Sequence, residues 1–257
     1  MSYKIVFFDI DGTLVNEEKQ IPNDTKEAIK RLKERGIEVA IATGRAPFHF
    51  TKIREELGID SFVSFNGSYV VYKGQVIYHH PFRQEDLALL EQEAKRRKHT
   101  MVFLSHKDFF ANVDQDLHVI QSFHSLKLTP PKYRQQYWQE ETIYQALLYC
   151  EADEEKYYHD HYPHFHFVRW HQYSMDVIPK GGSKAKGIEM FLRQLDINPS
   201  EAVAFGDGLN DREMLSFVGA GVAMGNAHEE VKPFAKFTTK HVDEGGIRFG
   251  LKQLQLI

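Results

Sequence analysis

The chain has little of several features that would assign it to a specialised class. Its 257 residues contain one cysteine, Cys150, so no disulfide can form within the chain, and we expect a reducing compartment. The apolar run "IYQALLYCEA" predicts that Cys150 is a small core residue. No long uncharged stretch could cross a bilayer. The start, "MSYKIVFFDI", reaches an aspartate too early for a signal peptide, so we expect a cytoplasmic protein with no membrane partner.

An excess of basic residues is also lacking. Lys and Arg number 32 against 36 Asp and Glu, a formal net charge of −4, which argues against a nucleic-acid partner. What remains is the composition of an ordinary globular protein, with 42% hydrophobic and 26% charged residues. Such a chain can bury a core in one large domain or two smaller ones. We expect a monomer or weak homodimer that acts on a small molecule.

Strand and helix patterns alternate from the beginning of the chain. The apolar runs "KIVFFDI", "IEVAIATGR" and "FVSFNG" predict buried strands, and the segments "IPNDTKEAIKRLKERG" and "APFHFTKIREELG" between them predict helices that end at glycine. "SYVVYKGQVIYHHPF" predicts a hairpin that turns at Lys73-Gly74. The alternation resumes after Pro179 with "SKAKGIEMFLRQL", "AVAFGD", "NDREMLSFVG" and "AGVAM", and "AHEEVKPFA" and "DEGGIRFGLKQL" predict short closing helices. The fold class is therefore α/β, a Rossmann-like three-layer parallel sheet.

The segment between these two parts has a different residue composition and a different secondary-structure pattern. It has fewer long helices and more Tyr, His and Phe, which predicts a smaller α+β domain inserted into the first, with "LKLTPPKYRQQYWQ" as a loop. The predicted boundaries are 1–82 and 180–257 for the discontinuous core and 83–179 for the inserted cap. In "HDHYPHFHFVRWH" the His-Phe alternation predicts a strand with phenylalanines inward and histidines outward, rather than a metal site.

Small, polar and acidic residues follow several predicted strands. "DIDGT", "TGR", "NG" and "GDGLND" all fall at strand ends, and ligands of open parallel sheets bind beyond the carboxyl ends of the strands. Asp9 and Asp11 stand two residues apart, so strand geometry would point both side chains the same way, with Cα atoms about 6–7 Å apart. Because four such motifs occur in order, we interpret them as one site.

The residue types indicate chemistry on a phosphate group. Asp9 would attack phosphorus and form an aspartyl-phosphate, while Asp11 would protonate the leaving alkoxide and then help to deprotonate water. Asp207 adds a third carboxylate, and an oxygen-rich site of few carboxylates suits Mg²⁺. We expect Asp9 and Asp207 to ligate the ion through their side chains and Asp11 through its carbonyl, with Asn210 and Asp211 in or just outside the shell.

Other residues at the same edge would bind the substrate. Thr43 supplies a hydroxyl donor to a phosphoryl oxygen, and Lys184 supplies a cation that neutralises both phosphate and Asp9. "KGGSKAKG" contains three lysines; the spacing from Pro179 favours Lys184, and Lys186 would face solvent. The predicted substrate-binding residues on the loops are Gly44, Arg45, Asn66 and Gly67.

"DIDGT", "TGR", a lysine after a small-residue turn, and "GDGLND" resemble the four motifs of the haloacid dehalogenase superfamily. The inserted domain, "FNGSYV" and "DEGGI" are similar to its Cof-type phosphatase subfamily, which carries a large α/β cap. The resemblance spans nearly the whole chain. It implies Asp9 as nucleophile, Asp11 as acid/base, Thr43 and Lys184 as phosphate partners and Asp207 as a metal ligand. The aspartate at position 11 is the residue that phosphatases and mutases of the superfamily carry and dehalogenases lack.

These observations predict a Mg²⁺-dependent phosphatase that hydrolyses a small phosphomonoester, such as a sugar phosphate or a nucleotide-like metabolite. Two alternatives remain open at this point. A phosphomutase would use the same motif residues, and assays of phosphate release against isomer formation separate the two. A non-catalytic phosphometabolite-binding protein on the same scaffold is disfavoured because the full set of catalytic side chains is present.

Overall fold

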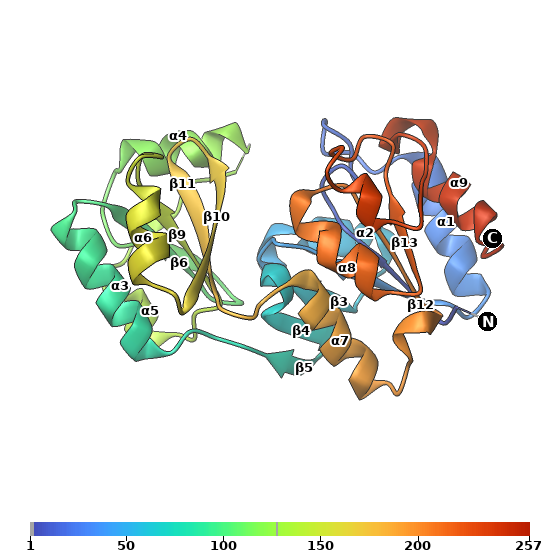
Figure 1. Cartoon of the computed structure of the whole chain (residues 1–257), viewed down its shortest axis with the longest axis horizontal. Coiled ribbons are helices and arrows are strands. Elements are labelled where there is room, and N and C mark those ends of the chain that lie inside the picture. The colour runs from blue at the N-terminus through green and yellow to red at the C-terminus, as the bar shows by residue number, and fades with distance from the viewer. Residues whose placement is uncertain (1–2, 127) are drawn as a thin grey trace. The chain divides into compact units, whose positions relative to one another are not determined.

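The computed structural model describes residues 3–126 and 128–257, which form two compact units (Figure 1). The core unit comprises residues up to Arg45, His49–His79 and Ser183–Ile257, and the inserted unit comprises Ala46–Phe48 and His80–Gly182. The insertion expected at 83–179 falls inside the inserted unit. The sequence pattern did not assign Ala46–Phe48 to that unit.

The core unit is built on an eight-stranded sheet in the order β14-β13-β12-β1-β2-β3-β4-β5. Its strands are β1 (Ile5–Phe8), β2 (Glu38–Ala42), β3 (Phe62–Ser64), β4 (Tyr69–Tyr72), β5 (Gln75–His79), β12 (Ala202–Gly206), β13 (Ala220–Ala223) and β14 (Phe237–Thr238). The strands from β14 to β3 in this order pair in parallel, whereas β4 and β5 add an antiparallel hairpin. The predicted turn at Lys73-Gly74 is confirmed, and both residues have positive φ, 47° and 78°.

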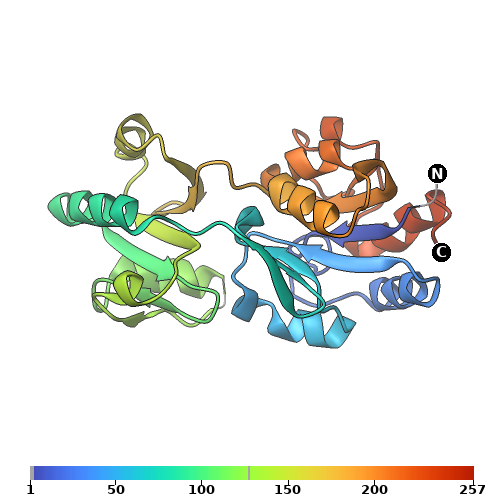
Figure 2. The ribbon, with the colours of Figure 1, turned by 90° about the horizontal axis from the view of Figure 1, so that it is seen from below.

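Helices cover both faces of this sheet (Figures 1 and 2). They are α1 (Asn23–Glu34), α2 (Thr51–Leu57) and α9 (Gly246–Gln253) on one face, and α7 (Lys184–Gln194) and α8 (Arg212–Phe217) on the other. The run "IVFF" of β1 is fully buried because successive side chains enter opposite layers. Phe7 packs edge-on against Phe191 of α7, and Phe8 stacks on Phe205 of β12. The three-layer α/β prediction is confirmed.

Short 3₁₀ turns take the place of some predicted elements. They are Pro47–His49, Phe65–Gly67, Pro199–Glu201, Leu209–Asp211, Lys232–Phe234 and Val242–Glu244. The helix predicted for "AHEEVKPFA" is wrong, because only the turn Lys232–Phe234 forms there. Pro233 lies inside that turn, and a proline cannot donate the backbone hydrogen bond that a continuing α-helix requires.

The inserted unit has a six-stranded, mostly antiparallel sheet in the order β10-β11-β9-β6-β7-β8. Its strands are β6 (Thr100–Leu104), β7 (Phe109–Ala111), β8 (Lys132–Tyr133), β9 (Gln145–Tyr149), β10 (Phe165–His171) and β11 (Ser174–Pro179), and its helices are α3 (Gln84–Arg96), α4 (Leu117–Ser125), α5 (Tyr137–Glu140) and α6 (Glu155–His161). The loop predicted for "LKLTPPKYRQQYWQ" is wrong at two places, where β8 and α5 form. Tyr137 and Trp138 of α5 are buried. The His-Phe alternation is confirmed, since Phe165 and Phe167 are buried and His166 is exposed.

Among the described residues, none of the helices has the length and apolar character that crossing a bilayer requires.

Candidate active site

The carboxyl ends of parallel strands bring distant residues together at one edge of the core sheet. Asp9 directly follows β1, Thr43 follows β2, and Asp207 follows β12. β1 lies between β2 and β12, and the backbone N–H of Asp9 donates to the carbonyl oxygen of Phe205 at 3.0 Å. The structure therefore brings Asp9 and Asp207, which are 198 positions apart in the sequence, together, because β1 and β12 are hydrogen-bonded neighbours.

Lys184 is the cation of this site. It opens helix α7, whose N-cap Ser183 accepts a hydrogen bond from the backbone N–H of Lys186. The Lys184 Nζ donates to Asp9 Oδ1 at 2.5 Å and to Asp211 Oδ1 at 2.6 Å, and the side chain is 1% exposed. Lys186 instead pairs with Glu189 at the surface. The lysine favoured by spacing is therefore the one that reaches Asp9.

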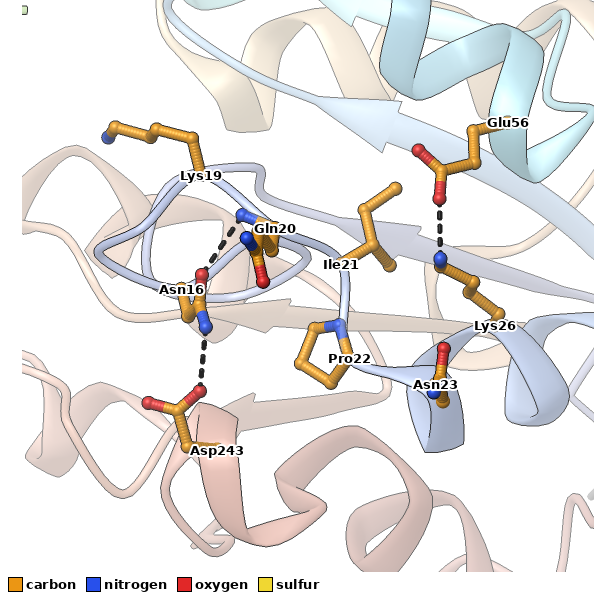
Figure 3. A pocket seen from close by; sticks show the side chains of 9 residues that line it. All are labelled: Asn16, Lys19, Gln20, Ile21, Pro22, Asn23, Lys26, Glu56 and Asp243. Carbon is orange, nitrogen blue, oxygen red and sulfur yellow. Dashed lines mark hydrogen bonds and ion pairs between the residues drawn. The ribbon is translucent and has the colours of Figure 1, made fainter.

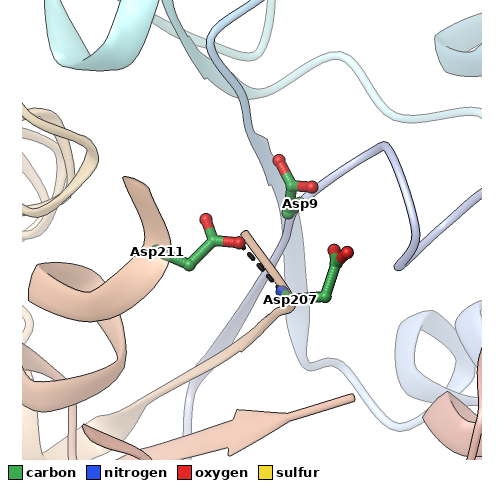
Figure 4. Close-up of side chains that lie close together, drawn as sticks. All are labelled: Asp9, Asp207 and Asp211. Atoms are coloured by element: carbon green, nitrogen blue, oxygen red, sulfur yellow. Dashed lines mark hydrogen bonds between the residues drawn. The ribbon is translucent and has the colours of Figure 1, made fainter. Parts of the chain in front are cut away.

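Three carboxylates lie close together at this edge of the sheet, those of Asp9, Asp207 and Asp211 (Figure 4). One carboxylate oxygen from each of Asp9, Asp207 and Asp211 lies within 4.8 Å of the other two. Asp211 is fully buried, and its Oδ2 accepts the backbone N–H groups of Asp207 and Gly208, both at 2.9 Å. Since its Oδ1 also binds Lys184, Asp211 holds the lysine and the loop in place and has less free capacity than Asp9 or Asp207 to bind a cation.

The electrostatics show that one lysine does not balance these acids. Burial raises the pKa of Asp9 well above its usual range, Lys184 opposes this, and the neighbouring carboxylates add to it. Burial and the charge of Asp211 raise the pKa of Asp207 to about 7. Burial disfavours the charged form of Lys184, but Asp211 and Asp9 outweigh it and raise the lysine pKa. A cluster of hard oxygen donors that lacks positive charge fits a divalent cation such as Mg²⁺.

Asp11 is engaged by different partners. β1 ends at Phe8, so Asp9 and Asp11 lie beyond the strand and the expected strand geometry does not apply to them; Gly12, whose φ is 71°, begins the turn that follows. Arg45 binds Asp11 with two hydrogen bonds, from Nε to Oδ2 at 2.8 Å and from Nη2 to Oδ1 at 2.6 Å. Lys19 Nζ donates to the same Oδ1 at 2.7 Å. Burial works against ionisation, but these two cations lower the pKa of Asp11.

The remaining predicted residues form the floor of the site. Thr43 is buried, and its Oγ1 accepts the backbone N–H of Arg45 at 3.1 Å, which leaves the hydroxyl proton free to be donated. Gly44 lies against the side chain of Asn66, which accepts a hydrogen bond from Asn210 at 2.9 Å. A Cβ on Gly67 would overlap the carbonyl oxygen of Ser183, directly before Lys184.

Sequence reasoning missed three supporting residues. Thr13 donates its hydroxyl to Asp207 Oδ1 at 2.9 Å, and Asn226 donates to the carbonyl oxygen of Gly12 at 2.8 Å. Asn226 follows β13, so its position near a strand end was a usable signal. Lys19 lies in a turn far from any strand end, and nothing in the local sequence indicates that it reaches Asp11.

A cavity of about 440 Å³ lies beside the turn that carries Lys19 (Figure 3). Asn16 accepts the backbone N–H of Gln20 and donates to Asp243, both at 3.0 Å, which anchors the turn. Across the cavity Lys26 pairs with Glu56.

Comparisons with known proteins agree with this geometry. The model of the haloacid dehalogenase-like hydrolase family matches residues 6–251. The YkrA protein of Bacillus subtilis (strain 168) is 44% identical over 257 residues, which cover 100% of both chains. A crystal structure of a protein from Geobacillus kaustophilus HTA426 matches with 56% identity and a TM-score of 0.96 over 100% of both chains. The subclass IIB sugar phosphatase BT4131 matches with 30% identity and a TM-score of 0.86, over 99% of this chain and 100% of the other.

The fold and the site thus define an enzyme of the hydrolase class. The chain belongs to the haloacid dehalogenase-like hydrolase family, as its sequence motifs predicted, and its relatives support a phosphatase.

Proposed function

We propose that this phosphatase uses Mg²⁺ to hydrolyse small phosphomonoesters through an aspartyl-phosphate on Asp9. The observation that carries the proposal is the position of Asp9. It lies at a strand end, its carboxylate binds the buried ammonium of Lys184, and Asp207 lies beside it. Asp9, the proposed nucleophile, is therefore close to both a cation and a second carboxylate, which are the charged groups that phosphoryl transfer requires.

The proposed reaction has two steps. An Asp9 oxygen attacks phosphorus as the bond from phosphorus to the ester oxygen breaks, and Asp11, in its protonated form, gives its proton to the leaving alkoxide. Water then attacks the phosphorus of the aspartyl-phosphate, Asp11 takes a proton from that water, and the Asp9 carboxylate is restored as inorganic phosphate forms. Arg45 and Lys19 bind the Asp11 carboxylate and hold it in one orientation.

Two groups would stabilise charge on the transferring phosphoryl group. Lys184 is already bound to Asp9, so its ammonium is positioned beside the carboxylate that attacks. The Thr43 hydroxyl has its proton available for a phosphoryl oxygen. Each such contact is a charge-stabilising interaction of the kind whose removal costs about 10²–10³ in kcat.

The residues present fit a hard divalent cation. Asp9 and Asp207 would hold it through carboxylate oxygens and Asp11 through its backbone carbonyl, with Asn210 and Asp211 acting around that set. When bound, the cation would neutralise the charge that builds up between the substrate phosphate and the carboxylates.

The substrate class is a small phosphorylated metabolite, with a sugar phosphate as the leading candidate. Support comes from BT4131, a sugar phosphatase of similar fold and length. Gly44, Arg45, Asn66 and Gly67 would contribute to binding of this substrate.

The test is phosphate release from a panel of sugar phosphates and nucleotides, with and without Mg²⁺. Activity that requires Mg²⁺ and is lost in Asp9→Asn supports the proposal, as does a phosphorylated Asp9 trapped at acidic pH. Isomer formation without phosphate release would indicate a phosphomutase. Tight binding of the panel with no turnover by the wild-type protein would indicate a binding protein.

A further inference from the structure

We propose that Asn66 is a positioning residue for the cation: its side-chain oxygen holds the amide of Asn210, so that Asn210 presents its own oxygen at the acidic cluster. The inference rests on the proposed Mg²⁺-dependent function. The contact that carries it runs from Asn210 Nδ2 to Asn66 Oδ1 at 2.9 Å and joins residues 144 positions apart.

The backbone holds Asn66 in an uncommon conformation. Its φ is 49° and its ψ is 40°, and the preceding Phe65 also has a positive φ of 50°. For a residue other than glycine, this left-handed conformation costs about 1–2 kcal/mol in conformational free energy, although asparagine tolerates it better than most. The backbone N–H of Asn66 donates to the carbonyl oxygen of Thr43 at 3.1 Å and that of Phe65 to Arg45 at 3.3 Å, which fixes the turn. Strain of this kind persists where the surrounding structure enforces it.

The side chain of Asn66 also has little freedom. It is 7% exposed, and it lies so close to Gly44 that a Cβ on that glycine would be 3.0 Å from Asn66 Nδ2 and 3.1 Å from Oδ1. Asn210, by contrast, is exposed and belongs to the short turn Leu209–Asp211. The buried amide is therefore the fixed partner and the exposed amide is the one it orients.

The orientation matters because the two ends of an amide are opposite in character. An asparagine side chain has one oxygen acceptor and one NH₂ donor, so committing Nδ2 of Asn210 to Asn66 turns its oxygen the other way. That oxygen lies over Gly208, where a Cβ would be 2.8 Å from it, in the loop that carries Asp207. An oxygen there favours a cation or a water bound to it, whereas an NH₂ group would oppose both.

Outer residues that orient groups around a metal typically change metal affinity by 10–100-fold when they are removed. We therefore expect Asn66→Gly to weaken Mg²⁺ binding about tenfold, measured by calorimetric titration of MgCl₂ into the protein. Glycine is chosen because it adopts a positive φ without cost, so the turn can be kept while the side chain is lost. A melting curve of the metal-free variant checks that it is folded.

A double-mutant cycle tests the route of the effect. If Asn66 acts through Asn210, Asn210→Ala weakens Mg²⁺ binding to a similar degree, and the double variant binds no more weakly than Asn210→Ala alone. If the double variant instead loses Mg²⁺ affinity by the product of the two single losses, the inference is overturned, because Asn66 would then act independently of Asn210. An unchanged Mg²⁺ affinity in Asn66→Gly overturns it as well.

The same titrations distinguish this inference from the function on which it rests. A wild-type protein that does not bind Mg²⁺ contradicts the proposed cofactor, and both proposals fall. A wild-type protein that binds Mg²⁺ and an Asn66→Gly variant that binds it equally well contradict only the role of Asn66. Inorganic phosphate serves as a second probe, and a loss confined to phosphate binding would assign Asn66 to the substrate instead.

Discussion

Arg45 and Asp11 form a two-pronged ion pair, with hydrogen bonds of 2.8 and 2.6 Å between guanidinium and carboxylate. The two residues belong to different loops at the same sheet edge, so the pair joins the segment after β1 to the segment after β2. The planar guanidinium fixes the plane of the carboxylate, which a lysine could not do. Arg45 therefore positions the proposed acid/base residue.

The first prediction concerns this pair. Asp11→Asn should lower kcat about 10²–10⁴-fold, because the amide cannot give or take the proton. Arg45→Met should lower kcat as well, by loss of orientation, but should cost little more when Asp11→Asn is already present. The measurement is steady-state kinetics of the two single variants and the double variant. Additive losses would mean that Arg45 acts on the substrate rather than through Asp11.

The second prediction compares two lysines of α7. Lys184→Met should lower kcat about 10²–10³-fold, because it removes the charge that faces Asp9 and Asp211. Lys186→Met, two residues away and paired with Glu189 at the surface, should leave kcat within about twofold of the wild type. The metal-free Lys184→Met protein should also melt at a lower temperature, since two buried carboxylates lose their partner. Equal kcat values for the two variants would remove Lys184 from the mechanism.

The strands and the acidic edge of the sheet could be predicted because they follow from patterns in short stretches of sequence. Continuous apolar runs such as "IVFF" indicate strands covered on both faces, and the rule that ligands bind at carboxyl ends then places Asp9, Thr43 and Asp207 together. Lys184 could also be predicted, since it opens a helix after a turn of small residues. These features depend on residues close to one another along the chain.

What could not be predicted depends on backbone turns and side-chain packing that short sequence patterns do not indicate. The pairing of Asp11 with Lys19 requires a positive-φ turn that no propensity indicates, and Lys19 itself has a φ of 63°. The choice of Asp211 as an anchor for Lys184, with both oxygens occupied, follows from side-chain packing rather than from spacing. Nor does a helical pattern reveal that Gly67 and Ser183 touch.

The third prediction concerns that close approach. Gly67→Ala should destabilise the protein by more than about 3 kcal/mol, because its Cβ would overlap the Ser183 carbonyl oxygen in a backbone with φ of 99°. Gly74→Ala is the matched control, since its φ is 78° but nothing lies within 4 Å of the added Cβ, so only the conformational cost of about 1–2 kcal/mol applies. Urea unfolding of both variants measures the difference. Similar losses in the two would contradict the packing argument.

The fourth prediction concerns pH and Mg²⁺. Because the pKa of Asp207 is raised to about 7 and that of Asp9 is raised as well, the metal-free cluster retains protons near neutral pH. A cation must displace them, so Mg²⁺ affinity should fall about tenfold per proton for each pH unit below 7. Titrations at pH 6, 7 and 8, in buffers of different ionisation enthalpy, measure both the affinity and the protons released. Asp207→Asn should bind more weakly and show a flatter profile, and a wild-type affinity independent of pH would contradict the assignment.

The fifth prediction concerns the inserted unit, where burial raises the pKa of Asp176 on β11 to about 7, against a hydrogen bond from Gln145. A carboxyl whose pKa is higher in the folded than in the unfolded state binds its proton more tightly when folded. Its contribution to stability is therefore present below pH 4 and is lost as the pH rises from 4 to 7.

Asp176→Asn removes this titration and keeps a side chain that can hydrogen-bond Gln145. The variant should consequently gain stability relative to the wild type as the pH rises from 5 to 8, by at least about 1 kcal/mol, or roughly 3 °C in melting temperature. The exposed Asp153→Asn serves as the control and should show no such trend. Melting curves recorded across this pH range give the comparison directly, and a difference that stays constant or shrinks towards pH 8 would show that Asp176 titrates normally in the folded protein.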